Sequence, residues 1–209
     1  MKRHGYFITF EGTEGSGKST QIRLLAAWLR RQGAAIVQTH EPGGTELGRA
    51  IRRVLLHRRA LRITPRAELA LFMASRAQLV EDVIAPALRR GRVVICDRFL
   101  DSTLAYQGGG SGLDLALIRR LGADVTRGAR PDLTFLLDLE ARQGLRRLGR
   151  TRDRMEAKAL RYHARVRRQY RTLARAEPHR IIVLDATQPI DALRRAIRAI
   201  VSKQLEKCI

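Results

Sequence analysis

Cysteine and long apolar runs are scarce in this chain of 209 residues. Its two cysteines are Cys96, inside an apolar run, and Cys208, next to the last residue, which excludes a disulfide framework and a cysteine-based metal cluster. No apolar run approaches the roughly 18 residues that a membrane span needs, and the run 6–10 is too short for the core of a signal peptide. We therefore expect a soluble, cytoplasmic protein that does not enter a membrane, with Cys96 as a small core side chain.

Acidic and aromatic residues are also few. The chain has 20 acidic and 41 basic residues, only five of the basic ones are lysine, and the formal net charge is +21. Such an excess of arginine favours anionic partners. Aromatic residues make up 5% of the chain and the arginines are scattered through predicted helices, which argues against a nucleic-acid partner. A site for small phosphorylated ligands is the favoured interpretation.

Five short apolar runs recur along the chain, with a stretch of helical periodicity between each pair. They are 6–10, 35–37, 93–96, 133–137 and 181–184. This alternation predicts an α/β fold in which a five-stranded parallel sheet is wound with helices on both faces. The length suits one domain covering residues 1–209.

Helix punctuation adds detail to this outline. Thr64-Pro65 predicts a capping hydroxyl followed by proline at the first helical position, and Asp191 lies in the predicted first turn of the last helix. Pro86 predicts a kink or a break within 66–90. The three glycines 108–110 predict a flexible loop, and the spacing of apolar residues in 161–175 predicts an amphipathic helix.

The segment 12–19 fits the phosphate-loop pattern G-x-x-x-x-G-K-[ST], directly after the first apolar run and before a predicted helix over 19–31. Its glycines let successive backbone N–H groups point at phosphate oxygens, and Lys18 brings a positive charge to the β- and γ-phosphates. Ser19 offers a hydroxyl to Mg²⁺. The segment therefore predicts a nucleoside triphosphate site made by Gly12, Thr13, Gly15, Ser16, Gly17, Lys18, Ser19 and Thr20.

Polar motifs follow every predicted strand, at the edge of a parallel sheet where ligands bind. Asp97 ends the third run, a usual place for the carboxylate that holds Mg²⁺ in phosphate-loop enzymes, and Arg98 beside it can grip a phosphate with a planar fork of donors. A phosphate acceptor is already ionised and needs no strong general base, but its approach to a γ-phosphate creates repulsion that arginines must offset. The excess of arginine therefore favours a kinase with a phosphorylated acceptor.

Seven motifs, in order along nearly the whole chain, resemble those of the bacterial thymidylate kinases. They are 10–20, 41–45, 72–79, 97–99, 101–108, 130–134 and 185–189. The resemblance implies the P-loop NTPase fold of nucleoside monophosphate kinases. It also implies transfer of the γ-phosphoryl group of ATP to dTMP, giving dTDP for dTTP synthesis, with Mg²⁺ as cofactor and a homodimer as the usual assembly.

The resemblance also implies roles for the dTMP pocket. Glu14 would meet the sugar 3′-hydroxyl, and Arg52 and Arg98 would hold the acceptor phosphate. Phe72 would stack on thymine and Arg76 would hydrogen-bond its exocyclic oxygen, although helical spacing without the motif would favour core packing for Phe72. The pocket would be completed by Ser102, Thr103, Tyr106 and Gln107, with the tyrosine placed to crowd out a 2′-hydroxyl. The residues expected near adenine are Arg147, Thr187 and Gln188.

Two positions differ from those in other members of the family. Gly15 follows Glu14, as in the bacterial members that supply the catalytic arginine from a mobile lid instead of the phosphate loop. The lid would cover about 149–156, and its candidate catalytic arginines are Arg150, Arg152 and Arg154. The other candidate catalytic residues are Lys18, Asp97 and Arg98. Phe99 stands where tyrosine or histidine is frequent in the family, which leaves that position without a side-chain hydrogen-bonding group.

Two other functions stay open at this point. The charge of +21 would also suit a nucleic-acid-binding ATPase, although no motif for orienting water or stacking bases is evident. A related kinase acting on another nucleotide is the second alternative, because sequence ranks base preference only weakly.

Overall fold

The computed structural model describes residues 5–57, 61–148 and 153–206. Its described residues form the strands β1 (Tyr6–Glu11), β2 (Ile36–His40), β3 (Val93–Asp97), β4 (Leu133–Asp138) and β5 (Ile181–Asp185). They make one parallel sheet in the order β2-β3-β1-β4-β5. The predicted fold class is confirmed, and the strands differ from the apolar runs mainly at their carboxyl ends, since β2 continues to His40.

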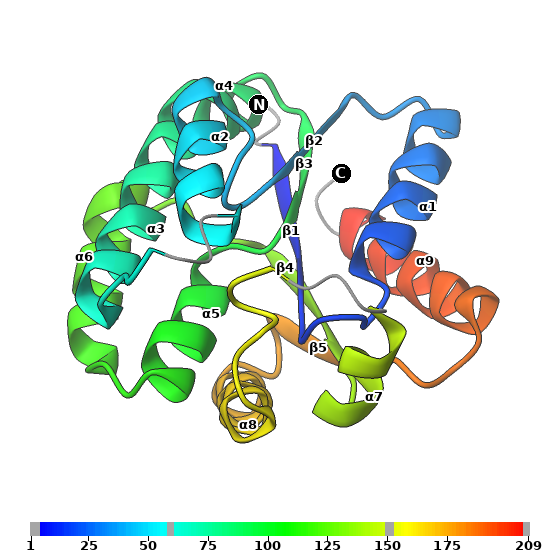
Figure 1. Cartoon of the computed structure of the whole chain (residues 1–209). Helices are drawn as coiled ribbons and strands as arrows, with labels where there is room; N and C mark the ends of the chain where they lie inside the picture. The colour runs from blue at the N-terminus through cyan, green and yellow to red at the C-terminus, as the bar shows by residue number, and fades with distance from the viewer. Residues whose placement is uncertain (1–4, 58–60, 149–152, 207–209) are drawn as a thin grey trace.

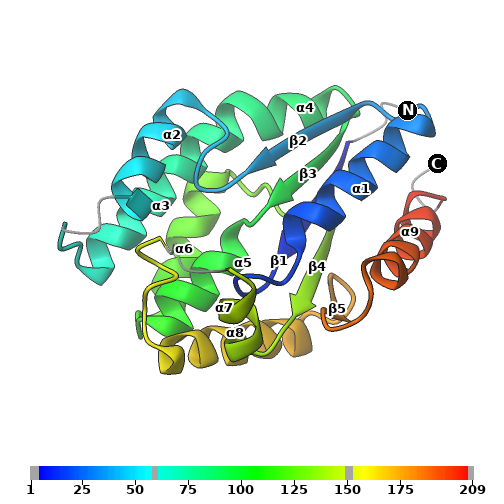
Figure 2. The ribbon, with the colours of Figure 1, turned by 45° about the vertical axis from the view of Figure 1, so that its right-hand side comes forward.

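Helices cover both faces of the sheet, as Figures 1 and 2 show: α1 and α9 lie together on one side, and α2, α3, α4 and α6 lie on the other. The helices are α1 (Lys18–Arg31), α2 (Glu46–Arg52), α3 (Pro65–Leu79), α4 (Ala85–Arg89), α5 (Leu100–Thr103), α6 (Leu115–Thr126), α7 (Ala141–Arg147), α8 (Leu160–Ala176) and α9 (Ile190–Glu206). The π-helical segments are η1 (Arg53–His57), η2 (Val80–Ile84) and η3 (Leu104–Gly110). Within the described ranges, no helix combines the length and the apolar character that crossing a membrane would require.

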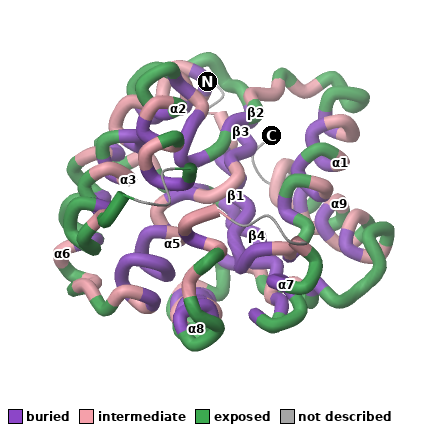
Figure 3. Tube along the Cα trace, viewed as in Figure 1, coloured by how far each residue is buried: buried purple, intermediate pink, exposed green. Residues whose placement is uncertain are grey.

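The central strands β1, β3 and β4 are mainly apolar because both faces of the sheet are covered, whereas the edge strands β2 and β5 are only partly buried. Ile8 and Phe10 pack with Leu25 of α1 and with α9, whereas Phe7 points to the opposite face and packs with Leu79 of α3. All of these side chains are buried, and buried residues follow the strands in Figure 3. The continuous apolar runs of the sequence thus reflect two-sided burial.

The predicted helix punctuation is largely confirmed. The Thr64 hydroxyl accepts a hydrogen bond of 3.4 Å from Ala67 N, with Pro65 at the start of α3. The expected interruption in 66–90 comes earlier than Pro86, because the π-helical segment η2 already separates α3 from α4. Pro86 instead lies in the first turn of α4, where its missing N–H removes few helical hydrogen bonds. The amphipathic helix over 161–175 is α8.

The prediction of a flexible loop at 108–110 is wrong. These glycines end η3, and Gly108 and Gly110 are buried. A Cβ added to Gly109 would lie 2.4 Å from Gln169 Cβ, and one added to Gly110 would lie 2.6 Å from the Tyr162 ring. The glycines therefore permit a close approach of η3 to α8, which explains their clustering better than mobility does.

Candidate active site

A cavity of about 550 Å³ lies at the carboxyl edge of the sheet, where parallel α/β sheets bind their ligands. Its volume is in the range of small-molecule sites. The predicted site residues that line it are Glu14, Gly15, Lys18, Ser19, Arg52, Phe72, Arg76, Asp97, Arg98, Ser102, Thr103, Tyr106 and Gln107. The fold thus brings together the phosphate loop, the end of β3, α3 and η3, which are far apart in sequence.

The phosphate loop connects β1 to α1 and needs glycine for two different reasons. Gly17 precedes α1 with a φ of +88°, and no described atom lies within 4 Å of where its Cβ would be, so the backbone conformation alone requires glycine. Gly15 has a φ of +68°, and its Cβ would lie only 2.3 Å from the carbonyl oxygen of Gly144. The loop is therefore pressed against α7, which fixes its backbone amides.

Lys18 is the buried cation of this loop. Its Nζ donates hydrogen bonds of 2.9 Å to Thr13 O and 3.1 Å to Gly12 O. Burial lowers the pKa of Lys18 to about 8, and the nearby Arg98 charge acts in the same direction. A phosphate group beside Nζ would favour the charged form, because an opposite charge at close range raises the pKa of an ammonium group.

Ser19 and Asp97 bring two oxygen donors together at the mouth of the loop. The Ser19 hydroxyl donates a hydrogen bond of 3.1 Å to Asp97 Oδ2, across the space between α1 and the end of β3. Hydroxyl and carboxylate oxygens are hard ligands that suit Mg²⁺, which is commonly bound through one or two carboxylates together with substrate phosphates. The donor set therefore fits the ion that the sequence predicts here.

Arg98 is held tightly between β3 and α5. Its φ of +70° lies in the left-handed region, which costs a residue with a Cβ about 1–2 kcal/mol. NH1 donates hydrogen bonds of 3.2 Å to Ser102 Oγ and 3.2 Å to Tyr170 Oη, and the guanidinium lies 5.0 Å from the centre of the Tyr106 ring. Such strain is often found at functional sites, which makes Arg98 a candidate functional residue.

Glu14 is an ionised carboxylate near the guanidinium of Arg98. The Tyr106 hydroxyl donates a hydrogen bond to Oε1, and Arg98 NH2 lies 3.6 Å from the same oxygen. His163 Nδ1 lies 3.2 Å from Oε2, although neither atom has a well-aligned hydrogen-bond partner among the described residues. Burial would raise the pKa of Glu14, but the closeness of His163 and the Arg98 charge outweigh it and lower the pKa to about 2.

Arg76 and Phe72 form one wall of the cavity from the same face of α3. The Arg76 guanidinium is buried, and its Nε donates a hydrogen bond of 2.8 Å to Glu41 Oε2. Its NH2 donates a hydrogen bond of 2.8 Å to Thr103 Oγ1, so this hydroxyl holds the arginine from the other side. Burial raises the pKa of Glu41, and the Arg76 charge opposes that shift. The direction of the guanidinium is thus set before any ligand binds.

Arg147 and the turn after β5 lie outside this cavity. Thr187 and Gln188 are exposed, and their side chains donate hydrogen bonds to Asp185. Arg147 NH1 lies 3.3 Å from both Gly15 O and Ala186 O, so it joins the phosphate loop to this turn. The three residues expected near adenine therefore gather on the α7 side of the loop.

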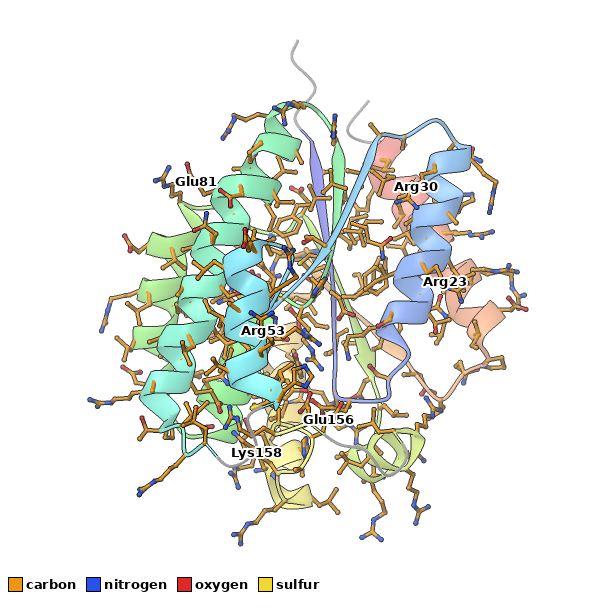
Figure 4. All side chains as sticks on the ribbon, turned by 45° about the horizontal axis from the view of Figure 1, so that its top comes forward. Arg23, Arg30, Arg53, Glu81, Glu156 and Lys158 are labelled. Atoms are coloured by element: carbon orange, nitrogen blue, oxygen red, sulfur yellow. The ribbon has the colours of Figure 1, made fainter. Side chains whose placement is uncertain are left out.

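The expected lid is only partly within the described residues, since Arg150 and Arg152 lie outside them. Arg154 is described, and its Nε donates a hydrogen bond of 2.7 Å to Leu55 O while its NH2 pairs with the buried carboxylate of Glu68. Lys158 Nζ lies 3.4 Å from the same carboxylate. Figure 4 shows Lys158 near the start of α8. Arg154 thus fastens the described part of the expected lid to η1 and α3.

Glu11, His163 and Tyr170 contact predicted site residues but have no role in the sequence-based predictions. Glu11 could have been noticed as a carboxylate at the end of an apolar run. The other two lie on α8, whose periodicity indicated core packing and carried no sign of the site.

One cavity is lined both by the phosphate loop and by the oriented arginines Arg76 and Arg98, and this arrangement is typical of phosphate-loop kinases. A family model described as thymidylate kinase matches residues 10–197. The thymidylate kinase of Deinococcus radiodurans is 52% identical over 202 residues, covering 96% of this chain and 98% of that protein. That of Roseiflexus sp. (strain RS-1) is 48% identical, covering 95% and 94%.

A solved structure agrees with these relatives. The crystal structure of thymidylate kinase from Ehrlichia chaffeensis matches with a TM-score of 0.78 at 34% identity, covering 95% of this chain and 99% of that one. The chain therefore belongs to the thymidylate kinase family.

Proposed function

We propose the following roles for the residues with which this chain, as a thymidylate kinase, phosphorylates dTMP to dTDP with ATP as donor. ATP binds through its phosphates to the phosphate loop, and dTMP binds in the pocket between Arg98 and α3. The observation that supports this most is that Lys18 and Arg98 line the same cavity. Two anionic groups that meet there are both within reach of fixed positive charge.

The donor phosphates are held by the backbone amides of the loop and by Lys18. The amides are rigid because the loop packs against α7, so they need no reorganisation as charge moves during transfer. Lys18 places its charge where the β- and γ-phosphates meet. Ser19 and Asp97 would hold Mg²⁺, which neutralises charge on the phosphate oxygens when it is bound.

The acceptor phosphate of dTMP is held by Arg98 and Arg52. Arg52 NH1 donates a hydrogen bond of 2.8 Å to Pro42 O, which directs this side chain along the cavity wall. The acceptor oxygen is already largely ionised at neutral pH, so the enzyme needs no strong base and acts by positioning and charge. Arginine suits this task because its planar fork binds two phosphate oxygens at once.

The rest of dTMP is recognised by oriented polar groups. Phe72 stacks on thymine and Arg76 donates to its exocyclic oxygen, supported by Glu41 behind it. Glu14 accepts from the sugar 3′-hydroxyl, and Tyr106 closes the space that a 2′-hydroxyl would need. Ser102, Thr103 and Gln107 complete the wall, and on the donor side Arg147, Thr187 and Gln188 lie near adenine.

A catalytic arginine from the lid is also part of the proposal, and the contacts of Arg154 favour Arg150 or Arg152 for this role. We expect Arg154→Ala to lower the free energy of unfolding by about 3 kcal/mol, because it removes one partner of a buried ion pair. We expect Arg150→Ala or Arg152→Ala to lower kcat strongly without such a change. Chemical denaturation and steady-state kinetics on the three variants measure both effects. A large loss of kcat with unchanged stability in Arg154→Ala would contradict this assignment.

We also propose that the chain acts as one domain in the cytoplasm and forms a homodimer, as the resemblance implies. The exposed leucines Leu47, Leu61 and Leu121 support an apolar contact, since they belong to α2, the segment before α3, and α6. These elements share one side of the molecule in Figure 1.

A panel of monophosphate acceptors tests the proposed pocket. With MgATP, we expect dTMP to be phosphorylated with a kcat/KM at least about 100-fold above those of dCMP, dAMP and dGMP, because an oriented guanidinium rejects bases that cannot pair with it. ADP formation measures all four rates. Equal rates would favour the alternative of a kinase with another acceptor, and stimulation of ATP hydrolysis by DNA would favour the nucleic-acid alternative.

The distribution of arginine argues against the nucleic-acid alternative. Figure 4 shows Arg23 and Arg30 on α1 and Arg53 on the far side of the strands from α1, so positive charge is spread over the molecule.

A further inference from the structure

Glu11 lies behind the phosphate loop, at the end of β1, with none of its surface exposed. Its Oε1 accepts a hydrogen bond of 2.7 Å from Phe99 N. Its Oε2 lies 2.6 Å from Ser102 Oγ and 2.8 Å from Tyr170 Oη, and these two hydroxyl oxygens lie 2.7 Å from each other. Three oxygen atoms therefore form a closed triangle in which every side has the length of a hydrogen bond.

The three contacts of this triangle need one more hydrogen than the two hydroxyl groups supply. Each side requires one hydrogen, but Ser102 and Tyr170 supply only one each. Tyr170 keeps its hydrogen, because burial raises its pKa well above the ordinary value and the charge of Glu11 acts in the same direction. Arg98 NH1 donates to both hydroxyl oxygens from outside at 3.2 Å, so it adds nothing to the sides of the triangle. With an ionised Glu11, one short contact would have no hydrogen, and a proton on Oε2 completes the ring.

We propose that Glu11 holds a proton when dTMP is bound, and that the neutral ring of Glu11, Ser102 and Tyr170 positions Arg98 for the acceptor phosphate. The inference rests on the proposed function, in which Arg98 binds that phosphate. An ionised Glu11 would draw part of the Arg98 charge to itself through the two hydroxyl groups, whereas a neutral ring leaves that charge for the substrate. Glu11 is thus a positioning residue that acts through Arg98.

The surroundings of Glu11 favour proton uptake. The titratable or charged groups that face it from the neighbouring elements are Asp101 of α5, Arg98, Lys18 of α1, Cys96 of β3 and Tyr170 of α8. Burial and the Asp101 charge raise the pKa of Glu11 to about 7, although Ser102, Arg98 and Tyr170 oppose the rise. Asp101 itself stays in place through its ion pair with Arg180, at 2.7 Å. A dianionic phosphate nearby would raise the pKa of Glu11 further, so the ring gains a proton as dTMP binds.

Calorimetric titration of the enzyme with dTMP at pH 8, in buffers of different ionisation enthalpy, counts this proton. Free Glu11 would be mostly ionised one unit above its pKa, so we expect uptake approaching about 0.9 proton per dTMP bound. The phosphate of dTMP contributes little, because its second pKa is about 6 and it is already a dianion at pH 8. Glu11→Gln should remove this contribution, and any uptake that remains belongs to Lys18, whose pKa of about 8 also rises beside a phosphate. The matched control Glu81→Gln, at an exposed glutamate on the outer surface (Figure 4), should leave it unchanged.

The outcomes separate this inference from the proposed function. No uptake by the unchanged enzyme, or undiminished uptake by Glu11→Gln, overturns the inference. If Glu11→Gln does not fold, Tyr170→Phe replaces it: one oxygen contact then remains, the Ser102 hydrogen satisfies it, and uptake should fall well below that of the unchanged enzyme. Undiminished uptake by Tyr170→Phe also overturns the inference. If dTMP affinity is unchanged in Arg98→Ala, the proposed role of Arg98 fails; if affinity falls but no proton is taken up, only the ring proposal fails.

Discussion

Replacing Lys18 by alanine is expected to lower kcat about 1,000-fold or more, which is the size of effect seen when a fixed charge is removed from a transferred phosphoryl group. The amides of the loop remain in this variant, but the charge beside the β- and γ-phosphates is lost. Because the Lys18 side chain is buried, water cannot fully replace the ammonium group. Steady-state formation of ADP and dTDP at saturating substrates measures the change.

A matched control tests whether the loss of activity is caused by the position of Lys18 and not by the loss of a lysine as such. Lys203→Ala removes an exposed lysine from α9 and should leave kcat within about twofold, since exposed charges far from the site contribute little. Circular dichroism shows whether both variants are folded. Activity of Lys18→Ala close to that of the unchanged enzyme would mean that the loop binds something other than the transferred phosphate.

Replacing Arg98 by alanine should reduce kcat/KM for dTMP about 100-fold or more, while the KM for ATP changes by less than about threefold. In the proposed complex the guanidinium faces the acceptor phosphate, and its hydrogen bonds to Ser102 and Tyr170 hold it in place. Its loss therefore removes the charge that offsets repulsion between the two phosphates. Arg98→Lys should recover part of the loss, because it restores the charge but lacks the planar fork.

Replacing Arg98 also changes the strain of a backbone with positive φ, and a second arginine of this kind serves as the control. Arg127 is a second arginine with a positive φ, of +48°, and its exposed side chain pairs with Glu81 on the surface. Arg127→Ala has the same chemistry in the same region of backbone conformation and should leave kcat/KM for dTMP unchanged. If both variants lost activity equally, or if Arg98→Ala weakened ATP and dTMP to the same degree, a general disturbance of the fold would explain the result.

Predictions from local patterns succeeded where the cause is local. The central strands are visible because burial on both faces makes them mainly apolar, and Thr64-Pro65 marks a helix start through its own hydrogen bond and fixed φ. The phosphate loop was visible because its backbone conformation demands glycine at set positions. Such signals involve neighbours in the chain, and a pattern of a few residues contains them completely.

Predictions failed or were absent where distant packing decides. The glycines 108–110 have the composition of a mobile loop, but their reason is the approach of α8, which begins some 50 residues later in the chain. Arg154 stays a candidate catalytic residue, but nothing in the sequence indicated that Glu68 and η1 hold its side chain. In both cases the contacting residue lies far away in the sequence, so only the packing of α3, η3 and α8 in the folded structure identifies it.

The chain's own order of residues was enough to specify a doubly wound parallel sheet, a triphosphate loop and a kinase acting on a phosphorylated acceptor, since periodicity, glycine placement and arginine excess are readable without a fold. Only the folded molecule shows that Glu11, Ser102 and Tyr170 share hydrogens behind Arg98, in contacts that span 91 and 159 positions. No repeating pattern encodes such a meeting, because it depends on how α5 and α8 dock against the carboxyl edge of the sheet.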